Sequence, residues 1–144
     1  KALEEGNYNY IDRAKLDPRA GLMAAYDADV FLSSANAITD DGIMVNIDGN
    51  SNRVSCIAQG PKKVVFIVGI NKVCSDLDAA MKRARNVAAP VNAQRFEVKT
   101  PCKTTGKCFD CKSPDTICCQ FLITRYSRHT GRIHVILVND NLGF

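Results

Sequence analysis

Five of the seven cysteines in the chain lie within the segment "PCKTTGKCFDCKSPDTICC" at residues 101–119. Their spacing is C-x5-C-x2-C-x6-C-C. Two thiolates separated by two residues can share one metal ion, and two more would complete the tetrahedron that is typical of sulfur sites. The lysines between them favour the thiolate form. The candidate metal ligands are Cys102, Cys108, Cys111 and either Cys118 or Cys119.

Three interpretations of this segment remain open. Structural disulfides fit poorly, because the sequence shows no secretory signal and has an odd number of cysteines, so we expect a cytoplasmic location. Unligated thiols are a better explanation for the isolated Cys56 and Cys74, which we expect to be buried and inert. Metal ligation is the interpretation we favour, with zinc and an iron–sulfur cluster as alternatives that the spacing does not separate. We expect His129 and His134 to be structural.

Three short apolar runs rich in Val, Ile and Phe predict strands that are buried on both faces. They are "DADVFLSS" at 27–34, "KKVVFIVG" at 62–69 and "RIHVILV" at 132–138. Continuous rather than alternating hydrophobicity is typical of a parallel sheet that is covered by helices. "FLITR" at 121–125 is a weaker candidate for a fourth strand. The sequence therefore predicts an α/β fold with a mostly parallel sheet flanked by helices.

The remaining segments predict a helix, a β-hairpin and a loop. Residues 75–90 begin with an S-x-x-D capping box, continue with apolar residues at helical spacing and end at a proline, which predicts the main helix. Residues 42–58 place two strand-like pieces around the turn-rich "DGNSN", which predicts the hairpin. Residues 99–118 show no periodicity, so we expect a cysteine-rich loop bounded at 99–120.

A polar loop follows each of the three predicted parallel strands. The carboxyl ends of parallel strands meet at one edge of a sheet, which is where open α/β folds bind ligands. There Lys72 and Arg53 would hold a small anionic ligand, and Asp41 and Asp48 are candidate catalytic bases. The simpler interpretation is that these polar residues only make turns. The candidate ligand-binding residues are Ser33, Ser34, Asn36, Thr39, Asn46, Asn52, Arg53, Gly69, Asn71 and Lys72.

Composition and charge narrow the function classes. A chain of 144 residues is most simply one domain over 1–144, and no apolar run approaches the roughly 20 residues of a membrane helix. The net charge of +4 is concentrated after residue 53, largely in "MKRAR" on the predicted helix. Because no aromatic residues alternate with these charges, we expect a solvated helix face and no nucleic-acid partner. The sequence leaves the oligomeric state open.

The polar loops also carry a family resemblance. "DADVFLSSANAITDDGIMVNIDGNSNRVSCIAQGPKKVVFIVGINKV", then "AMKRARNVAAPVNAQRF" and the closing "GRIHVILVNDNLGF", resemble the LUD domain of lactate-utilization proteins from about residue 8 onward. The more specific motifs are "NAIT-D-G-(x)n-N-x-D-G" and "G-x-NK". The resemblance implies a fold like that of ribose-5-phosphate isomerases, glucosamine-phosphate deaminases and CoA-transferases. It also implies that Asp29 and the 33–41 loop correspond to substrate-holding positions of the isomerases.

The same resemblance implies a subunit or accessory protein in the oxidation of lactate or a related organic acid, beside iron–sulfur and flavin-type redox proteins. Cysteine-rich segments recur in this branch of the family. LUD proteins usually carry an N-terminal helical and strand region that this chain lacks, so we expect a fragment. Two alternatives are an isomerase- or CoA-transferase-type enzyme for a phosphorylated ligand and a non-catalytic scaffold. No Ser/His/Asp set, G-x-G-x-x-G or P-loop motif is visible.

Overall fold

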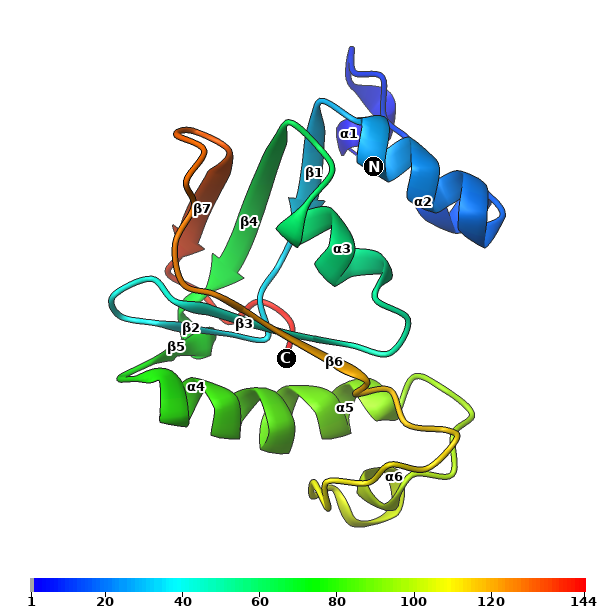
Figure 1. Cartoon of the computed structure of the whole chain (residues 1–144), viewed down its shortest axis with the longest axis vertical. Helices are drawn as coiled ribbons and strands as arrows, with labels where there is room; N and C mark the ends of the chain where they lie inside the picture. The colour runs from blue at the N-terminus through cyan, green and yellow to red at the C-terminus, as the bar shows by residue number, and fades with distance from the viewer. Residues whose placement is uncertain (1) are drawn as a thin grey trace.

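Two small sheets lie across one another in the computed structural model, which describes residues 2–144 (Figure 1). Sheet A contains β1 (Val30–Ser33), β4 (Lys63–Gly69) and β7 (Ile133–Val138) in the order β1-β4-β7, and both pairs are parallel. These strands are the three apolar runs of the sequence. The α/β fold with a mostly parallel sheet flanked by helices is therefore confirmed.

One face of sheet A carries the main core. Val64, Phe66 and Val68 of β4 are completely buried there, against α2 (Pro18–Asp27) and α3 (Asn52–Ala58). The other face is open within residues 2–144, although its side chains are apolar. Its exposed apolar residues are Val30, Leu32, Ile67 and Ile136. The expectation that these strands are buried on both faces is therefore wrong for the described residues, because alternate side chains of a strand point to opposite faces.

Sheet B holds four strands in the order β5-β2-β3-β6. They are β5 (Val73–Cys74), β2 (Ala37–Thr39), β3 (Met44–Asp48) and β6 (Gln120–Thr124). The β2–β3 and β3–β6 pairs are antiparallel, whereas β2 and β5 are parallel. The predicted fourth strand is thus confirmed as β6, but it belongs to this second, mixed sheet.

The hairpin predicted over residues 42–58 is wrong in its second half. β3 forms as expected, but the chain then turns into helix α3. The carboxylate of Asp48 accepts hydrogen bonds from the backbone N–H groups of Arg53 (2.8 Å) and Val54 (2.9 Å), and so satisfies donors of the first helical turn. A hairpin does form one strand earlier, where β2 and β3 are joined through residues 40–43.

The main helix differs from the prediction at both ends. Its N-cap is Asp76, whose carboxylate accepts the N–H of Ala79 at 2.8 Å, so the predicted Ser75 capping box is wrong. The helix also continues beyond Pro90, as α4 (Leu77–Arg83), a π-helical segment (Ala84–Ala88) and α5 (Ala89–Ala93). A proline ring clashes with the carbonyl group four residues earlier in a regular α-helix, and the wider π turn relieves this clash.

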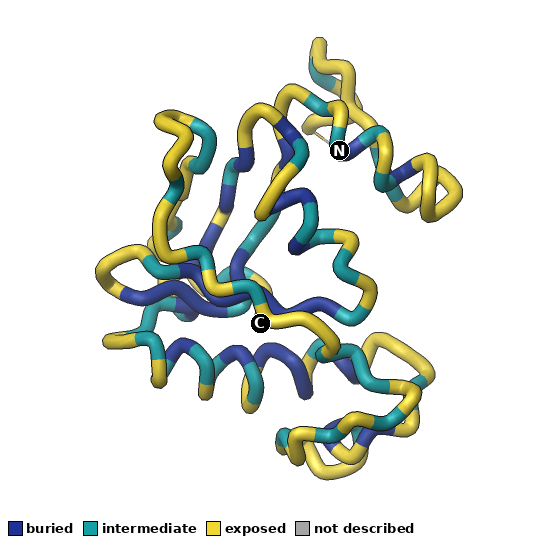
Figure 2. The backbone as a smooth tube through the Cα atoms, in the orientation of Figure 1, coloured by how far each residue is buried: buried dark blue, intermediate teal, exposed yellow. Residues whose placement is uncertain are grey.

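This helix covers sheet B with a stripe of small side chains. Ala80 and Ala84 are completely buried and pack against Ala37, Val45 and Ile47 of the sheet. Figure 2 shows the buried residues of the helix on the side that faces the strands. The alanine stripe lets the helix approach sheet B closely, which brings neighbouring side chains of the helix to the sheet.

The remaining elements are short. They are α1 (Ala2–Glu5), the 3-10 helices η1 (Arg13–Lys15) and η2 (Ile70–Lys72), and α6 (Pro101–Thr105). Helix α6 lies inside the predicted cysteine-rich loop, which otherwise has no regular structure until β6 begins at Gln120. Within residues 2–144, no helix has the length and hydrophobicity to cross a membrane.

Candidate functional site

The carboxyl ends of β1 and β4 lie side by side, and polar residues of the loops that follow them are in contact. Lys72, in η2 after β4, donates from Nζ to the hydroxyl oxygen of Ser34, just after β1, at 3.1 Å. Arg53 of α3 donates to the carbonyl oxygen of the same Ser34 at 2.9 Å. The structure thus brings these three predicted residues together, as parallel neighbouring strands require.

Arg53 is fully occupied by contacts within the protein. Its Nη1 donates to Asn46 Oδ1 (2.8 Å) as well as to Ser34, and its Nη2 donates to Asn36 Oδ1 (3.1 Å) and Ile47 O (2.9 Å). Its Nε completes the set with Asp48 Oδ1 at 3.2 Å. A guanidinium group has five N–H donors, so Arg53 has none left for a ligand. Its hydrogen bonds connect the ends of β1, β2 and β3.

Lys72 is in the opposite situation. Lys72 is only 5% exposed, and within residues 2–144 its ammonium group makes one hydrogen bond, to the neutral hydroxyl group of Ser34. Burial lowers the pKa of the Lys72 ammonium group, and the nearby cations Arg83 and Arg53 lower it further. No carboxylate within residues 2–144 forms an ion pair with it. Two N–H donors of a buried cation are therefore left for another acceptor.

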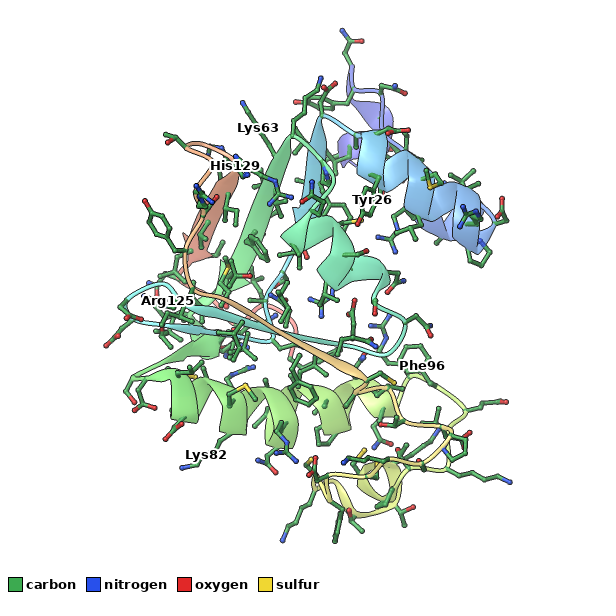
Figure 3. The ribbon with its side chains drawn as sticks, in the orientation of Figure 1. Tyr26, Lys63, Lys82, Phe96, Arg125 and His129 are labelled. Carbon is green, nitrogen blue, oxygen red and sulfur yellow. The ribbon has the colours of Figure 1, made fainter. Side chains whose placement is uncertain are left out.

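Arg83 of α4 is a site residue that the sequence analysis missed. Its Nε donates to the carbonyl oxygen of Asn71 at 3.0 Å, and its Nη1 donates to that of Asn36, whereas Nη2 has no hydrogen bond within residues 2–144. Burial lowers its pKa too. Lys82, by contrast, points away from sheet B (Figure 3). The sequence spacing could have indicated it, because Arg83 lies three residues after the buried Ala80 and hence on the same side of the helix.

Asn46 adds a neutral donor beside Arg53. It is completely buried in β3, and its Oδ1 accepts a hydrogen bond from Arg53. Its Nδ2 has no partner within the described residues. An unsatisfied buried amide costs free energy in the absence of a ligand, and its position next to Arg53 places it with Ser34 in the same polar cluster. Lys72, Arg83 and Asn46 therefore all retain free N–H donors.

Asn71 and Gly69 hold the segment after β7. Asn71 Oδ1 accepts the N–H of Leu142 at 3.2 Å, and its Nδ2 donates to the carbonyl oxygen of Gly143 at 3.3 Å. A Cβ atom at Gly69 would lie only 2.5 Å from Leu142 N and 2.7 Å from Asp140 O. The polar loop after β7 thus joins the same edge, where Gly143 lies close to Lys72 Nζ.

The other predicted ligand and catalytic residues have structural contacts. Thr39 and Asp41 hydrogen-bond to each other in the β2–β3 turn. Asn52 is exposed at the start of α3, and Ser33 Oγ donates to the backbone of Ser34. The carboxylate of Asp48 accepts three hydrogen bonds from Arg53 and Val54. Neither carboxylate proposed as a base contacts Lys72 in the structure.

Asp29 also lies apart from this cluster. It precedes β1, at the end of sheet A opposite to Ser34, and its carboxylate pairs with Lys62 at 2.7 Å on the surface. The pKa of this carboxyl is lowered by the hydrogen bond and the charge of Lys62. Asp29 is therefore not in contact with Ser34, Arg53 or Lys72.

Four of the five clustered cysteines line one cavity of about 30 Å³ under the cysteine-rich loop. They are Cys102 of α6, Cys108, Cys111 and Cys118, and Arg85 and Asp110 line the same cavity. Cys119 does not line it and is exposed. Burial raises the pKa of the Cys118 thiol to about 11, and the neighbouring cysteines raise it in the same direction. All seven cysteines of the chain are free thiols.

These thiols are near one another but are not arranged as a finished metal site. In residues 2–144, no group of three or more His, Cys, Asp or Glu side chains has a metal-binding arrangement. Cys56 is buried and Cys74 half-buried, away from the cavity. Both histidines are exposed, and His134 Nε2 hydrogen-bonds to Gly131 O at 2.7 Å. Zinc and an iron–sulfur cluster both remain interpretations of the sequence.

Comparison with known families identifies the family of the chain. A family model described as the LUD domain matches residues 1–138, which is nearly the whole chain. No curated protein and no solved structure matches the chain itself. The match includes β1, β4, β7 and the polar loops between them. The chain therefore belongs to the LUD domain family of lactate-utilization-type proteins.

Proposed function

We propose that this LUD domain binds the carboxylate of a small organic acid of the lactate type at the donor cluster of Lys72, Arg83 and Asn46, as part of the oxidation of that acid. The observation that carries the proposal is the buried ammonium group of Lys72, which hydrogen-bonds only to Ser34 and has no carboxylate partner in residues 2–144. The family membership supports the class of acid.

A buried cation without a counter-ion is costly, because burial removes water without supplying a negative charge in its place. The cost falls when an anion binds. Lys72 retains two N–H donors, and Arg83 retains those of Nη2. A carboxylate offers two oxygens and one negative charge, so it matches these two cations, and the Asn46 amide is a further donor for a hydroxyl or keto oxygen.

The contacts favour a carboxylate over a phosphate group. Arginine is the side chain best suited to bidentate phosphate binding, which uses two nitrogen atoms of one guanidinium group. Every donor of Arg53 is already used inside the protein, and Arg83 keeps free donors on Nη2 alone. Asp41 and Asp48, the candidate bases of an isomerase, have other contacts. The alternative of an enzyme for phosphorylated ligands therefore has less support than an acid-binding domain.

Oxidation of a 2-hydroxy acid to a 2-keto acid removes two electrons and two protons. We place the acceptor of these electrons in a partner subunit of the iron–sulfur or flavin type, so that this domain acts as a binding subunit.

Isothermal titration calorimetry of the whole chain tests the proposal. L-lactate, D-lactate and pyruvate are the ligands, and lactamide is the neutral control that lacks the carboxylate. Lys72→Met should abolish binding, whereas Lys63→Met should leave it unchanged. Lys63 is a matched control, because it is exposed at the first position of β4, the strand that η2 and Lys72 follow (Figure 3). Equal binding of lactate and lactamide, or normal binding by Lys72→Met, would contradict the proposal.

The alternatives have their own outcomes in the same experiments. Binding of sugar phosphates or CoA esters in place of the acids would favour the isomerase or CoA-transferase alternative. Binding of no small molecule would favour the scaffold alternative. At the level of the pathway, deletion of the gene in its native host should impair growth on lactate, and unchanged growth would count against the assigned role.

A further inference from the structure

The cavity under the cysteine-rich loop has the size and lining of a site for one small ion. The centre of a water-sized sphere can move through about 30 Å³ of it, which is more than the roughly 10–15 Å³ that one water molecule needs. Four thiol side chains line it, from Cys102, Cys108, Cys111 and Cys118. The sulfur lining of this cavity is chemically suited to a soft metal ion.

Three segments of the loop hold the thiols in place. Cys102 is buried on helix α6, with Thr100 Oγ1 at 3.3 Å from its sulfur. Cys108 and Cys111 lie in a segment without regular structure, in which the N–H of Asp110 donates to the sulfur of Cys108 at 3.4 Å. Asp110 adopts a left-handed conformation there, with φ of 52°. Both thiols of the C-x2-C pair line the same cavity.

The fourth thiol comes from the entry to β6. Cys118 packs against the core between the main helix and sheet B, and its side chain lines the cavity. The next residue, Cys119, donates its N–H to the carbonyl oxygen of Asp48 at 2.8 Å and so extends the β3–β6 pairing. Successive side chains of an extended chain point to opposite sides. Cys119 consequently lies outside the cavity, with its sulfur directed to Thr116 O.

Positive charge stands beside the cavity to balance bound thiolates. Arg85, on the main helix, donates from Nη2 to the sulfur of Cys108 at 3.7 Å and pairs with Asp110 at 2.7 Å. Four thiolates around a divalent ion carry a net charge of −2, and a nearby guanidinium group stabilises such a centre. Three lysines of the loop, Lys103, Lys107 and Lys112, add to the same local charge.

We propose that Cys102, Cys108, Cys111 and Cys118 bind one soft divalent metal ion as four thiolates, and that Cys119 is not a ligand. This site is separate from the acid-binding cluster and does not depend on it. Each thiol loses its proton to solvent when the metal binds, and no redox step is involved. The thiols of residues 2–144 have no metal-binding arrangement in the structure, so metal binding must bring the four sulfurs closer together.

Titration of the anaerobically reduced full chain with Co²⁺ alone tests this ligand set. Tetrahedral cobalt bound by thiolates has intense visible and charge-transfer absorption, and added Zn²⁺ should remove it. We expect one ion per chain for the wild type and for Cys119→Ser. Cys118→Ser should lose the tetrahedral spectrum and bind about 100-fold more weakly, since even loss of an outer contact costs 10- to 100-fold. Cys119→Ser is the matched control, one residue away.

A second variant separates the loss of a ligand from misfolding. Cys118 packs against the core, so Cys118→Ser could also disturb the fold. Cys108 is half-buried in the loop, and Cys108→Ser should show the same loss of the cobalt spectrum with an unchanged circular dichroism spectrum. Equal effects of Cys118→Ser and Cys119→Ser, or no cobalt binding by the reduced wild type, would overturn the proposal. Stoichiometric iron together with acid-labile sulfide in anaerobically purified protein would overturn it as well, in favour of a cluster.

Discussion

The ammonium group of Lys72 donates a 3.1 Å hydrogen bond to the hydroxyl group of Ser34. Ser34 directly follows β1 and Lys72 lies in η2 after β4, so this contact joins the carboxyl ends of two neighbouring parallel strands. Burial and the cations Arg83 and Arg53 lower the pKa of Lys72. A charged group is thus kept where the ligand-free protein disfavours its charge, which is the expected property of an anion site.

Replacement of Lys72 by methionine should stabilise the ligand-free protein at neutral pH. The folded-state pKa of Lys72 is below the unfolded value near 10.5, so the unfolded chain holds its proton more tightly and stability rises as the pH rises. The charged Lys72 therefore lowers the free energy of unfolding by its full amount at a pH below its folded-state pKa. This destabilisation is lost at a pH above its unfolded-state pKa. We expect Lys72→Met to gain about 1 kcal/mol near neutral pH.

Urea denaturation at several pH values measures this gain, and the advantage of Lys72→Met should disappear as the pH approaches 10.5. The exposed Lys63→Met is the control and should change stability little at any pH. A Lys72→Met protein that is less stable than the wild type near neutral pH would show that the ammonium group has a counter-ion in the ligand-free state.

Arg53→Lys should be strongly destabilising although it conserves charge. The guanidinium group of Arg53 connects β1, β2 and β3 through hydrogen bonds to Ser34, Asn36 and Asn46, among others. An ammonium group has only three donors and a different geometry. We expect a loss of roughly 2–4 kcal/mol in the free energy of unfolding. Thermal and urea unfolding measure it, and a change within experimental error would show that this network contributes little.

Gly69→Ala should displace the segment that follows β7. The added Cβ would clash with Asn71 Oδ1 and would lie 2.5 Å from Leu142 N, which is closer than unbonded atoms approach. Overpacking of this kind costs roughly 1–3 kcal/mol. Hydrogen–deuterium exchange should show faster exchange over residues 139–144, whereas the exposed Asn139→Ala should leave exchange there unchanged. Unaltered exchange in Gly69→Ala would mean that the contact with this segment is not maintained in solution.

The thiols should differ sharply in their reactivity toward iodoacetamide. Burial raises the pKa of Cys56, which is also completely inaccessible, whereas Cys119 is exposed. The thiolate is the reactive form, so Cys119 should be alkylated first and Cys56 only upon unfolding. Peptide mass spectrometry over a time course identifies the order. Early labelling of Cys56 in the native protein would contradict the packing of α3 against sheet A.

The sequence by itself determined the sheet and the location of the polar edge. Val, Ile and Phe in continuous runs have a large free energy of burial wherever the chain folds, so β1, β4 and β7 are visible as strands without tertiary information. Once these strands are parallel, their following loops must meet at one edge. The contact between Ser34 and Lys72 is a consequence of that rule.

The secondary structure of residues 52–58, in contrast, was decided by the tertiary structure. The piece "NRVSCIA" has strand-like composition, and local propensity is a weak prior that packing overrides. In the folded protein Asp48 satisfies the first N–H groups of α3, and Cys56 and Ile57 of that helix are buried against sheet A. These contacts join distant segments, so no local pattern reports them.

The roles of the individual site residues were also decided in three dimensions. From the sequence alone, Arg53 and Lys72 are equivalent as candidate cations. Only the folded structure shows that the donors of Arg53 are used in hydrogen bonds within the protein, whereas Lys72 uses one of its donors, to Ser34. Cys118 and Cys119 are likewise identical in type and adjacent in the chain. They differ because pairing of β6 with β3 directs one side chain to the core and the other to solvent, a consequence of strand geometry that depends on register.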